Sequence, residues 1–274
     1  MVVKKRKKQR TSKSETTERR DIMTRVKPVA EGDEFLTSLY YGRSGTGKTT
    51  LASTYPKRII LLDFKDRGTD SIRDVKGIDI LAMDAWSDVE DIYWALHRDK
   101  GQYKSVVLDT VAGMQNLAIA KVKEDNNIDE SESISRRGWG EVAGLMNTWL
   151  MNFRDLPMHV VFLAPDRIKN NTADDEDEEV QPEEGRLEPE VGPAVIPSVA
   201  RSLNAAVKVI GNTYIRQKQK VKEGKVVEIT GYMVRVGPHP YYITKIRSPK
   251  SFRTPGSIID PSFDKIIKIM KGEN

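Results

Sequence analysis

A glycine-rich phosphate-binding motif constrains this chain more than any other feature of its sequence. Residues 42–49 read Gly-Arg-Ser-Gly-Thr-Gly-Lys-Thr and match G-x-x-x-x-G-K-[ST] at each fixed position. They directly follow the apolar, aromatic stretch 35–41, which is typical of a buried strand. A strand that runs into such a loop and then into a helix is an arrangement that binds the phosphates of a nucleoside triphosphate. The motif therefore predicts a nucleotide-binding α/β protein.

The chemistry of the loop assigns roles to its residues. Glycines let backbone N–H groups point at the α- and β-phosphates, and the N-terminus of the following helix favours an anion. Lys48 is expected to reach the β- and γ-phosphates, and the Thr49 hydroxyl to ligate Mg²⁺, so the expected cofactors are ATP and Mg²⁺. The expected nucleotide-binding residues are Gly42, Arg43, Ser44, Gly45, Thr46, Gly47, Lys48, Thr49 and Thr50.

Short, nearly continuous apolar runs recur along the chain. Those at 58–64, 78–83, 106–109 and 159–164 are typical of strands covered on both faces. Helices are expected at 48–55, where Pro56 ends the run, and at 87–97, where Ser87 provides an N-cap. Strands that alternate with helices predict a parallel sheet flanked by helices, with right-handed crossovers.

The second half of the sequence changes in character. An amphipathic helix is expected from Pro197 to about Ile210. Residues 214–219 and 225–236 then alternate around Glu223-Gly224, as in a β-hairpin, and 241–244 is expected to be a further strand. The pattern predicts an antiparallel β-hairpin extension on the parallel core.

Composition and charge divide the chain into three parts. Residues 1–28 are expected to form a disordered basic arm, because the run 4–10 is highly charged and little apolar surface accompanies it. Residues 29–250 are expected to form the nucleotide-binding core, interrupted by an acidic mobile loop at 170–192, and 251–274 a C-terminal tail or helix. The basic arm either neutralises nucleic-acid phosphates or is a solvated terminus.

Several classes of site and location are disfavoured by composition. The chain has no cysteine and three scattered histidines, which do not form a metal-ligand spacing. No signal-like or membrane-length apolar run is present, so we expect a cytoplasmic protein with no membrane partner.

A second nucleotide-site element is expected at the end of the strand 106–109. A carboxylate at the carboxyl end of a buried strand beside the phosphate loop orients a Mg²⁺-bound water, which makes Asp109 the candidate. The alternative is an Asp that serves a turn or caps the next helix. AAA+ ATPases usually carry a catalytic Glu directly after this Asp, whereas this chain has Thr110, so its catalytic base must come from elsewhere.

The turn after the strand 59–64 carries a family resemblance. Residues 66–69 read Asp-Arg-Gly-Thr and are similar to the Glu-Gly-Gly-Thr-like turn of phage-encoded RecA-core ATPases, relatives of the RecA/RadA recombinases that act in recombination and single-strand annealing. Gly138-Trp139-Gly140-Glu141 resembles the Trp-Gly element of the same group, and we expect Trp139 to be packed. The resemblance implies a RecA-like P-loop NTPase core, with Asp66 as the catalytic base and Asp63 as the alternative.

Two further elements follow from the same resemblance. Residues 244–249 resemble the Lys-x-Arg fingers that RecA/RadA-type proteins insert into the nucleotide site of the next subunit, which implies catalytic roles for Lys245 and Arg247 and a homo-oligomeric ring or filament. The alternative is two solvated charges on an exposed strand. The γ-phosphate sensor position falls on Pro165, so that role passes to Asp166 or Arg167.

The resemblance implies an ATP-hydrolysing protein that acts on single-stranded DNA in phage recombination or repair, by annealing or strand pairing, with a single-strand binding protein as a further partner. A helicase or helicase-loader motor and a P-loop small-molecule kinase are the alternatives. Basic side chains that suit nucleic acid occur at Arg136, Arg137, Arg216, Lys218, Lys220, Lys222 and Arg253 and in the N-terminal arm.

Overall fold

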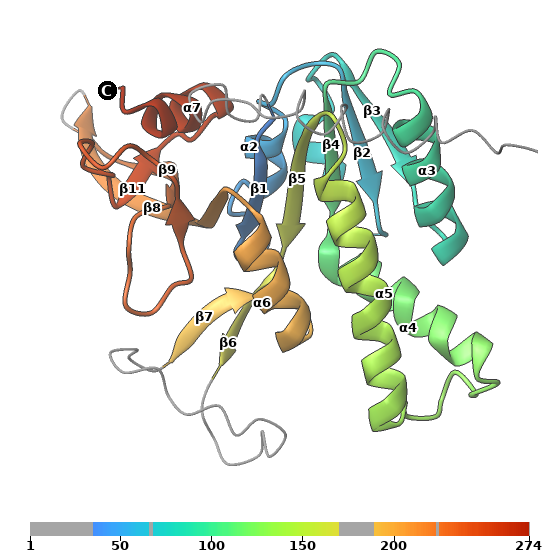
Figure 1. The fold of residues 1–274 in the computed structure, drawn as a ribbon. Helices are drawn as coiled ribbons and strands as arrows, with labels where there is room; N and C mark the ends of the chain where they lie inside the picture. Colours follow the sequence, from blue (N-terminus) through green and yellow to red (C-terminus); the bar gives the residue numbers. More distant parts are fainter. Residues whose placement is uncertain (1–34, 66–67, 170–188, 223–224, 274) are drawn as a thin grey trace, which may run out of the picture. The chain divides into compact units, whose positions relative to one another are not determined.

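A mostly parallel sheet forms the centre of the protein (Figure 1). The computed structural model describes residues 35–65, 68–169, 189–222 and 225–273, with the side chains of 218–229 left out. The strands run in the order β3-β2-β4-β5-β1-β8-β9-β11, and every pair from β3 to β8 is parallel. The parallel strands are β1 (Thr37–Tyr41), β2 (Ile59–Asp63), β3 (Ile78–Ala82), β4 (Ser105–Asp109) and β5 (His159–Ala164). The predicted α/β fold with a parallel core is therefore confirmed.

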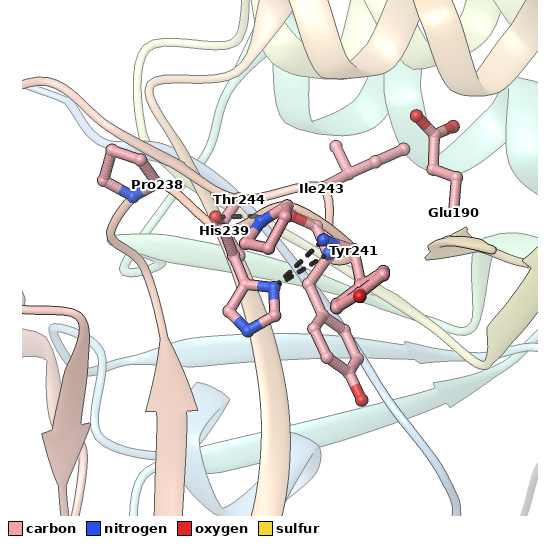
Figure 2. A pocket seen from close by; sticks show the side chains of 8 residues that line it. Glu190, Pro238, His239, Tyr241, Ile243 and Thr244 are labelled. Carbon is pink, nitrogen blue, oxygen red and sulfur yellow. Dashed lines mark hydrogen bonds between the residues drawn. The ribbon is translucent and has the colours of Figure 1, made fainter. Parts of the chain in front are cut away.

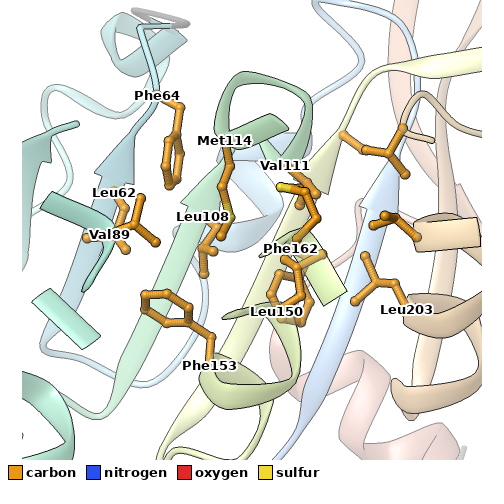
Figure 3. Close-up of a cluster of buried hydrophobic side chains, with 14 of the residues drawn as sticks. Leu62, Phe64, Val89, Leu108, Val111, Met114, Leu150, Phe153, Phe162 and Leu203 are labelled. Atoms are coloured by element: carbon orange, nitrogen blue, oxygen red, sulfur yellow. The ribbon is translucent and has the colours of Figure 1, made fainter. Parts of the chain in front are cut away.

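Helices cover both faces of this sheet and create two hydrophobic cores. The larger core lies under α3 (Trp86–Arg98), α4 (Val111–Asp125), α5 (Arg136–Arg154) and α6 (Pro197–Ala206). Figure 3 shows side chains of β2, β4 and β5 packed against side chains of α4 and α5. On the other face, α2 (Lys48–Ala52) and α7 (Phe263–Lys271) bury Leu51, Ile266 and Ile269. None of the helices in the described ranges is long and apolar enough to cross a membrane.

A hydroxyl network ties the strand before the phosphate loop to the segment after α2. The Tyr55 hydroxyl lies 2.6 Å from Ser38 Oγ and 2.8 Å from the Tyr40 hydroxyl, and all three groups are buried. Burial raises the pKa of Tyr55 to about 12, so the phenol stays protonated and able to donate. Buried hydroxyls of this kind are stable only when paired, which explains the tyrosines in this otherwise apolar stretch.

The antiparallel extension is also confirmed. β8 (Val209–Lys222) continues the core next to β1 and then pairs with β9 (Lys225–Arg235) through eleven register positions, from Asn212–Arg235 to Lys222–Lys225. β11 (Ser257–Ile259) and the short β10 (Lys245–Ile246) pair antiparallel with β9 and β8. The helix expected to reach Ile210 ends at Ala206, because Val209 and Ile210 pair with β1 and are buried there. Pairing with the sheet overrides the local helical pattern.

Two further local predictions need correction. The helix expected to begin after Ser87 begins at Trp86, and the Asp88 carboxylate accepts from the backbone N–H of Ala85 at 2.8 Å. Residues 241–244 form no strand element; Tyr242 makes an isolated bridge to Val191, within a stretch interrupted by Pro238 and Pro240.

Trp139 is 42% exposed, so the expectation that it packs in the core is wrong. The buried residues Gly138, Val142 and Met146 recur every four positions of α5, which places residue 139 beside this stripe.

A two-stranded ribbon of β6 (Asp166–Lys169) and β7 (Glu190–Pro193) was not expected. The acidic loop was predicted to reach residue 192, but residues 190–192 belong to β7. The remainder of that loop, 170–188, and the N-terminal arm lie outside the described residues. The hydrogen bonds of the ribbon satisfy backbone groups that a loop would leave to water.

Candidate nucleotide-binding site

The phosphate loop joins the carboxyl end of β1 to α2, as the motif predicts. Gly45 and Gly47 have φ angles of 79° and 84°, in the left-handed region that favours glycine. Gly42 lies against β8, where a Cβ atom would come within 2.4 Å of the Thr213 carbonyl oxygen. The Thr46 and Thr213 hydroxyls are 2.7 Å apart, so the loop is anchored on the strand beside it. Glycines are thus required for backbone conformation and for close approach.

The helix that follows the loop is shorter than predicted. It ends at Ala52 instead of Tyr55. The Ser53 and Thr54 hydroxyls donate to the carbonyls of Thr50 and Leu51 at 2.7 Å and so compete with the helical backbone pattern. A helix of this length has little macrodipole, so phosphate binding depends on the loop backbone and Lys48.

Lys48 is held at the loop itself. Its Nζ donates to the carbonyl oxygens of Gly42 at 2.8 Å and Arg43 at 2.9 Å. These carbonyls orient the ammonium group across the loop, where the β- and γ-phosphates of a nucleotide would lie. Phosphate oxygens can replace the carbonyls as acceptors without a large movement of the side chain.

Thr49 and Asp109 meet although they are 60 positions apart in sequence. The Thr49 hydroxyl donates to Asp109 Oδ2 at 2.9 Å, and Asp109 is only 2% exposed at the end of β4. Hydroxyl and carboxylate oxygens are ligands that suit Mg²⁺, so this pair fits the metal that accompanies a bound triphosphate. Among the described residues no group of three or more acidic or histidine side chains forms a metal site. A P-loop Mg²⁺ does not need one, because phosphate and water complete its ligands.

The alternative role for Asp109, a helix cap, is taken by its neighbour. Thr110 is the N-cap of α4, and its hydroxyl accepts from the Gly113 N–H at 3.2 Å. Thr110 therefore has a structural role that leaves the base of the reaction to another residue.

Asp63 lies beside Asp109 in the sheet. The two are register partners on the adjacent strands β2 and β4, so their side chains project from the same face. Leu61 and Val107, two positions earlier on these strands, belong to the core under α2, which places both carboxylates on the α2 side. Asp66, the first candidate for the base, lies outside the described residues.

The predicted γ-phosphate sensors begin the β6–β7 ribbon. Asp166 lines a cavity of about 320 Å³ together with the loop residues Arg43 and Thr46. Arg167, the next residue, is exposed and does not line this cavity. The structure therefore brings Asp166, and not Arg167, next to the phosphate loop.

Arg235 lines the same cavity and was missed by the sequence analysis. Its guanidinium lies between two tyrosines, 3.7 Å from the ring centroid of Tyr214 and 4.2 Å from that of Tyr242, and it donates to Asn212 Oδ1 at 2.5 Å. Such stacking holds the guanidinium in place. No local signal marks Arg235, because its partners come from two other segments: Asn212 and Tyr214 from β8, and Tyr242 from the stretch 238–244.

The segment 238–244 surrounds a second cavity, of about 290 Å³ (Figure 2). His239 Nδ1 accepts from the backbone N–H groups of Tyr241 at 3.1 Å and Tyr242 at 3.3 Å. Burial, with a smaller contribution from Arg235, lowers the pKa of His239 below its usual value. A neutral His239 keeps the acceptor that organises this turn.

The two predicted finger residues have different surroundings. Lys245 Nζ donates to the carbonyls of Asn204 at 2.8 Å and Ala205 at 3.1 Å, at the carboxyl end of α6. Burial and the nearby Arg247 lower the pKa of Lys245. β10 ends at Ile246, so Lys245 lies on this strand and Arg247 just outside it. Their role in a neighbouring subunit stays a prediction.

Comparison with known proteins gives one family and a set of remote structural similarities. Residues 34–248 match the model of the AAA domain. Among solved structures, the chain is similar to the flagellar accessory protein FlaH from Methanocaldococcus jannaschii, with 8% identity over 88% of this chain and 96% of that chain and a TM-score of 0.35. It is also similar to an ATPase from the type III secretion system of pathogenic bacteria, with 13% identity over 65% of this chain and 51% of that chain and a TM-score of 0.39. Identities and TM-scores at this level assign no activity. No curated protein matches the chain.

Proposed function

This chain belongs to the AAA domain family, and from that membership and the site geometry we propose an ATPase that acts on single-stranded DNA in phage recombination or repair, by annealing or strand pairing. The observation that carries the ATPase part is the hydrogen bond between Thr49 and Asp109, because it joins the phosphate loop to a carboxylate on a separate strand. The DNA-directed part rests on the resemblance of residues 66–69 to the turn of phage RecA-core proteins and on the basic side chains.

The residues of the site have different proposed roles in ATP hydrolysis. Lys48 would place positive charge at the β- and γ-phosphates, and Thr49 and Asp109 would hold the metal. When bound, Mg²⁺ supplies Lewis-acid stabilisation of the charge on the phosphate oxygens. Asp166 lines the adjoining cavity together with Arg43 and is the proposed γ-phosphate sensor.

The catalytic base is proposed to be Asp66, with Asp63 as the alternative. Asp63 shares a face with Asp109, and Asp66 follows it three positions later in the sequence. We expect an amide at the base to lower turnover about 10²-fold or more while ATP binding stays within a few fold, because an amide cannot accept a proton from water. Parallel turnover assays of Asp66→Asn and Asp63→Asn assign the role, and full activity in both variants would refute the proposal.

Binding of DNA is proposed to involve basic side chains. Arg136, Arg137, Arg216 and Arg253 are exposed, and Lys residues continue along the β8–β9 hairpin. A set of exposed cations binds phosphates without sequence preference and loses affinity steeply as salt rises. The proposed partner at these side chains is therefore single-stranded DNA. A single-strand binding protein as a further partner, and a location in the host cytoplasm, are proposed from the family resemblance alone.

Assembly into a ring or filament is proposed through Lys245 and Arg247. A cation supplied by a neighbouring subunit would stabilise charge on the γ-phosphate. Lys245 would have to leave the end of α6, where its ammonium group satisfies two carbonyls. Analytical sedimentation with and without a non-hydrolysable ATP analogue measures the oligomeric state and so tests the proposed assembly. A protein that stays monomeric under all conditions would refute it.

The decisive experiment measures ATP turnover with and without single-stranded DNA, at low and physiological salt, with Lys48→Ala as the matched control. We expect DNA to raise turnover in the wild type and salt to weaken this stimulation, because phosphate contacts release counterions. Lys48→Ala should lose turnover with and without DNA. ATP turnover that is the same with and without DNA would overturn the DNA-directed function and favour a kinase that acts on a small-molecule phosphate acceptor. Separation of DNA strands in the presence of ATP would favour a helicase-type motor.

A further inference from the structure

An exposed pair of apolar side chains lies beside the phosphate loop, on the β8–β9 hairpin. Ile215 of β8 and Tyr232 of β9 are register partners and are 46% and 45% exposed. The Tyr232 ring lies against the loop, because a Cβ atom on Gly47 would come within 2.9 Å of Tyr232 Cδ1. The pair therefore borders the residue that precedes Lys48.

Successive cross-strand residue pairs of the β8–β9 hairpin lie next to the phosphate loop and then beyond it. Thr213 and Val234 are buried, and Thr213 touches Gly42 and Thr46. Ile215 and Tyr232 form the next pair on the same face of the hairpin, directly beyond the loop. Val234 belongs to the core under α2, so this face lies on the α2 side of the sheet.

Polar side chains follow the apolar pair. Gln217 and Thr230 are register partners, are both exposed, and stand two residues further along the strands, which is a displacement of about 7 Å. The face thus presents an aromatic ring and a branched aliphatic group next to the phosphate loop, and then an amide and a hydroxyl. We call Ile215, Gln217, Thr230 and Tyr232 the hairpin shelf.

We propose that the hairpin shelf binds the nucleobase of the nucleotide whose phosphates the loop holds, with Tyr232 stacking on the base and Gln217 selecting adenine. The proposal rests on the proposed binding of ATP. A nucleotide is one molecule, so its base must lie within one ribose of the phosphates, and the shelf is an exposed aromatic surface that touches the loop itself. Base stacking on an aromatic side chain tolerates any base, whereas a Gln amide can both donate to and accept from the edge of adenine.

Binding measurements on full-length protein test the stacking role of Tyr232. ATP and inorganic tripolyphosphate, which has no base, are titrated with Mg²⁺ into wild type, Tyr232→Ala, Tyr232→Phe and Tyr241→Ala. We expect Tyr232→Ala to weaken ATP binding about tenfold or more and to change tripolyphosphate binding less than about twofold. The variant loses the stacking free energy between the ring and the base, and tripolyphosphate has no base to stack. Tyr232→Phe should bind ATP as the wild type does.

Tyr241→Ala is the matched control, because Tyr241 is 40% exposed but belongs to the segment 238–244 and not to the shelf. Equal weakening of ATP and tripolyphosphate in Tyr232→Ala would show that Tyr232 only supports Gly47, and it would overturn the proposal, as would no change for either ligand. Gln217→Ala should reduce the preference for ATP over GTP, and an unchanged preference would refute the selecting role.

The same experiment separates this proposal from the proposed function. ATP binding that is lost in Lys48→Ala but unaffected in Tyr232→Ala would leave the ATPase in place and remove the shelf. A wild type that binds neither ATP nor tripolyphosphate would overturn both.

Discussion

Asp109→Asn is expected to lower Mg²⁺-dependent ATP turnover on the order of 10³-fold. The substitution removes the negative charge that would face a bound Mg²⁺, and metal-assisted charge stabilisation is worth several kcal/mol of the barrier. Asp109 accepts a hydrogen bond from the Thr49 hydroxyl at 2.9 Å and is almost fully buried, so the variant removes the carboxylate that lies next to Thr49. Steady-state turnover at saturating ATP and a Mg²⁺ titration measure the effect.

Stability should change little in the same variant. An Asn side chain has nearly the shape of Asp, and its carbonyl oxygen can still accept from Thr49. We expect the free energy of unfolding to stay within about 1 kcal/mol, because the substitution replaces a buried charge with a neutral group that keeps the hydrogen bond. Asp91→Asn, on the exposed side of α3, is the matched control. Turnover within tenfold of the wild type would show that Asp109 does not hold the metal.

Phe162→Ala is expected to cost about 3–5 kcal/mol of the free energy of unfolding. Phe162 is 0% exposed at the middle of β5, where it is the register partner of Leu39 on β1 and Leu108 on β4 (Figure 3). Loss of the ring removes apolar contacts and leaves a cavity that neighbours on a parallel sheet can fill only in part. Urea unfolding followed by circular dichroism measures the difference.

The loss expected for Phe162→Ala is a large part of the total free energy of unfolding of a domain of this kind, which is about 5–15 kcal/mol. β5 lies between the strand that carries the phosphate loop and the strand that carries Asp109, so the same cavity would also disturb the spacing of the two halves of the site. Ile168→Ala, at a 54% exposed position on β6, is the control and should change stability by about 0.5 kcal/mol or less. A loss below 1 kcal/mol for Phe162→Ala would contradict the packing described here.

Elements with a strong local signal were predicted correctly. The phosphate loop, the strands of the parallel sheet and the long hairpin depend on residue type and period over a few positions, and the structure contains them all. The expectation that the strand at 78–83 is covered on both faces is wrong, because β3 lies at the edge of the sheet, where Ile80 is 53% and Leu81 39% exposed. Errors arose where distant partners decide the outcome. The end of α6 depends on the pairing of β8 with β1, and the exposure of Trp139 depends on which stripe of α5 faces the sheet.

The sequence by itself determined that the chain has a phosphate-loop motif between a strand and a helix, because the motif is contiguous and its glycines suit those backbone angles, and the motif predicts Lys48 and Thr49 as its functional side chains. It also identified Asp109 from the strand that ends there. Only the tertiary structure decided that Thr49 and Asp109 touch, that Arg235 is stacked between two tyrosines, and that Tyr232 lies against Gly47. The Thr49–Asp109 and Gly47–Tyr232 contacts join segments far apart in sequence, and strand order and register, which no local pattern specifies, bring them together.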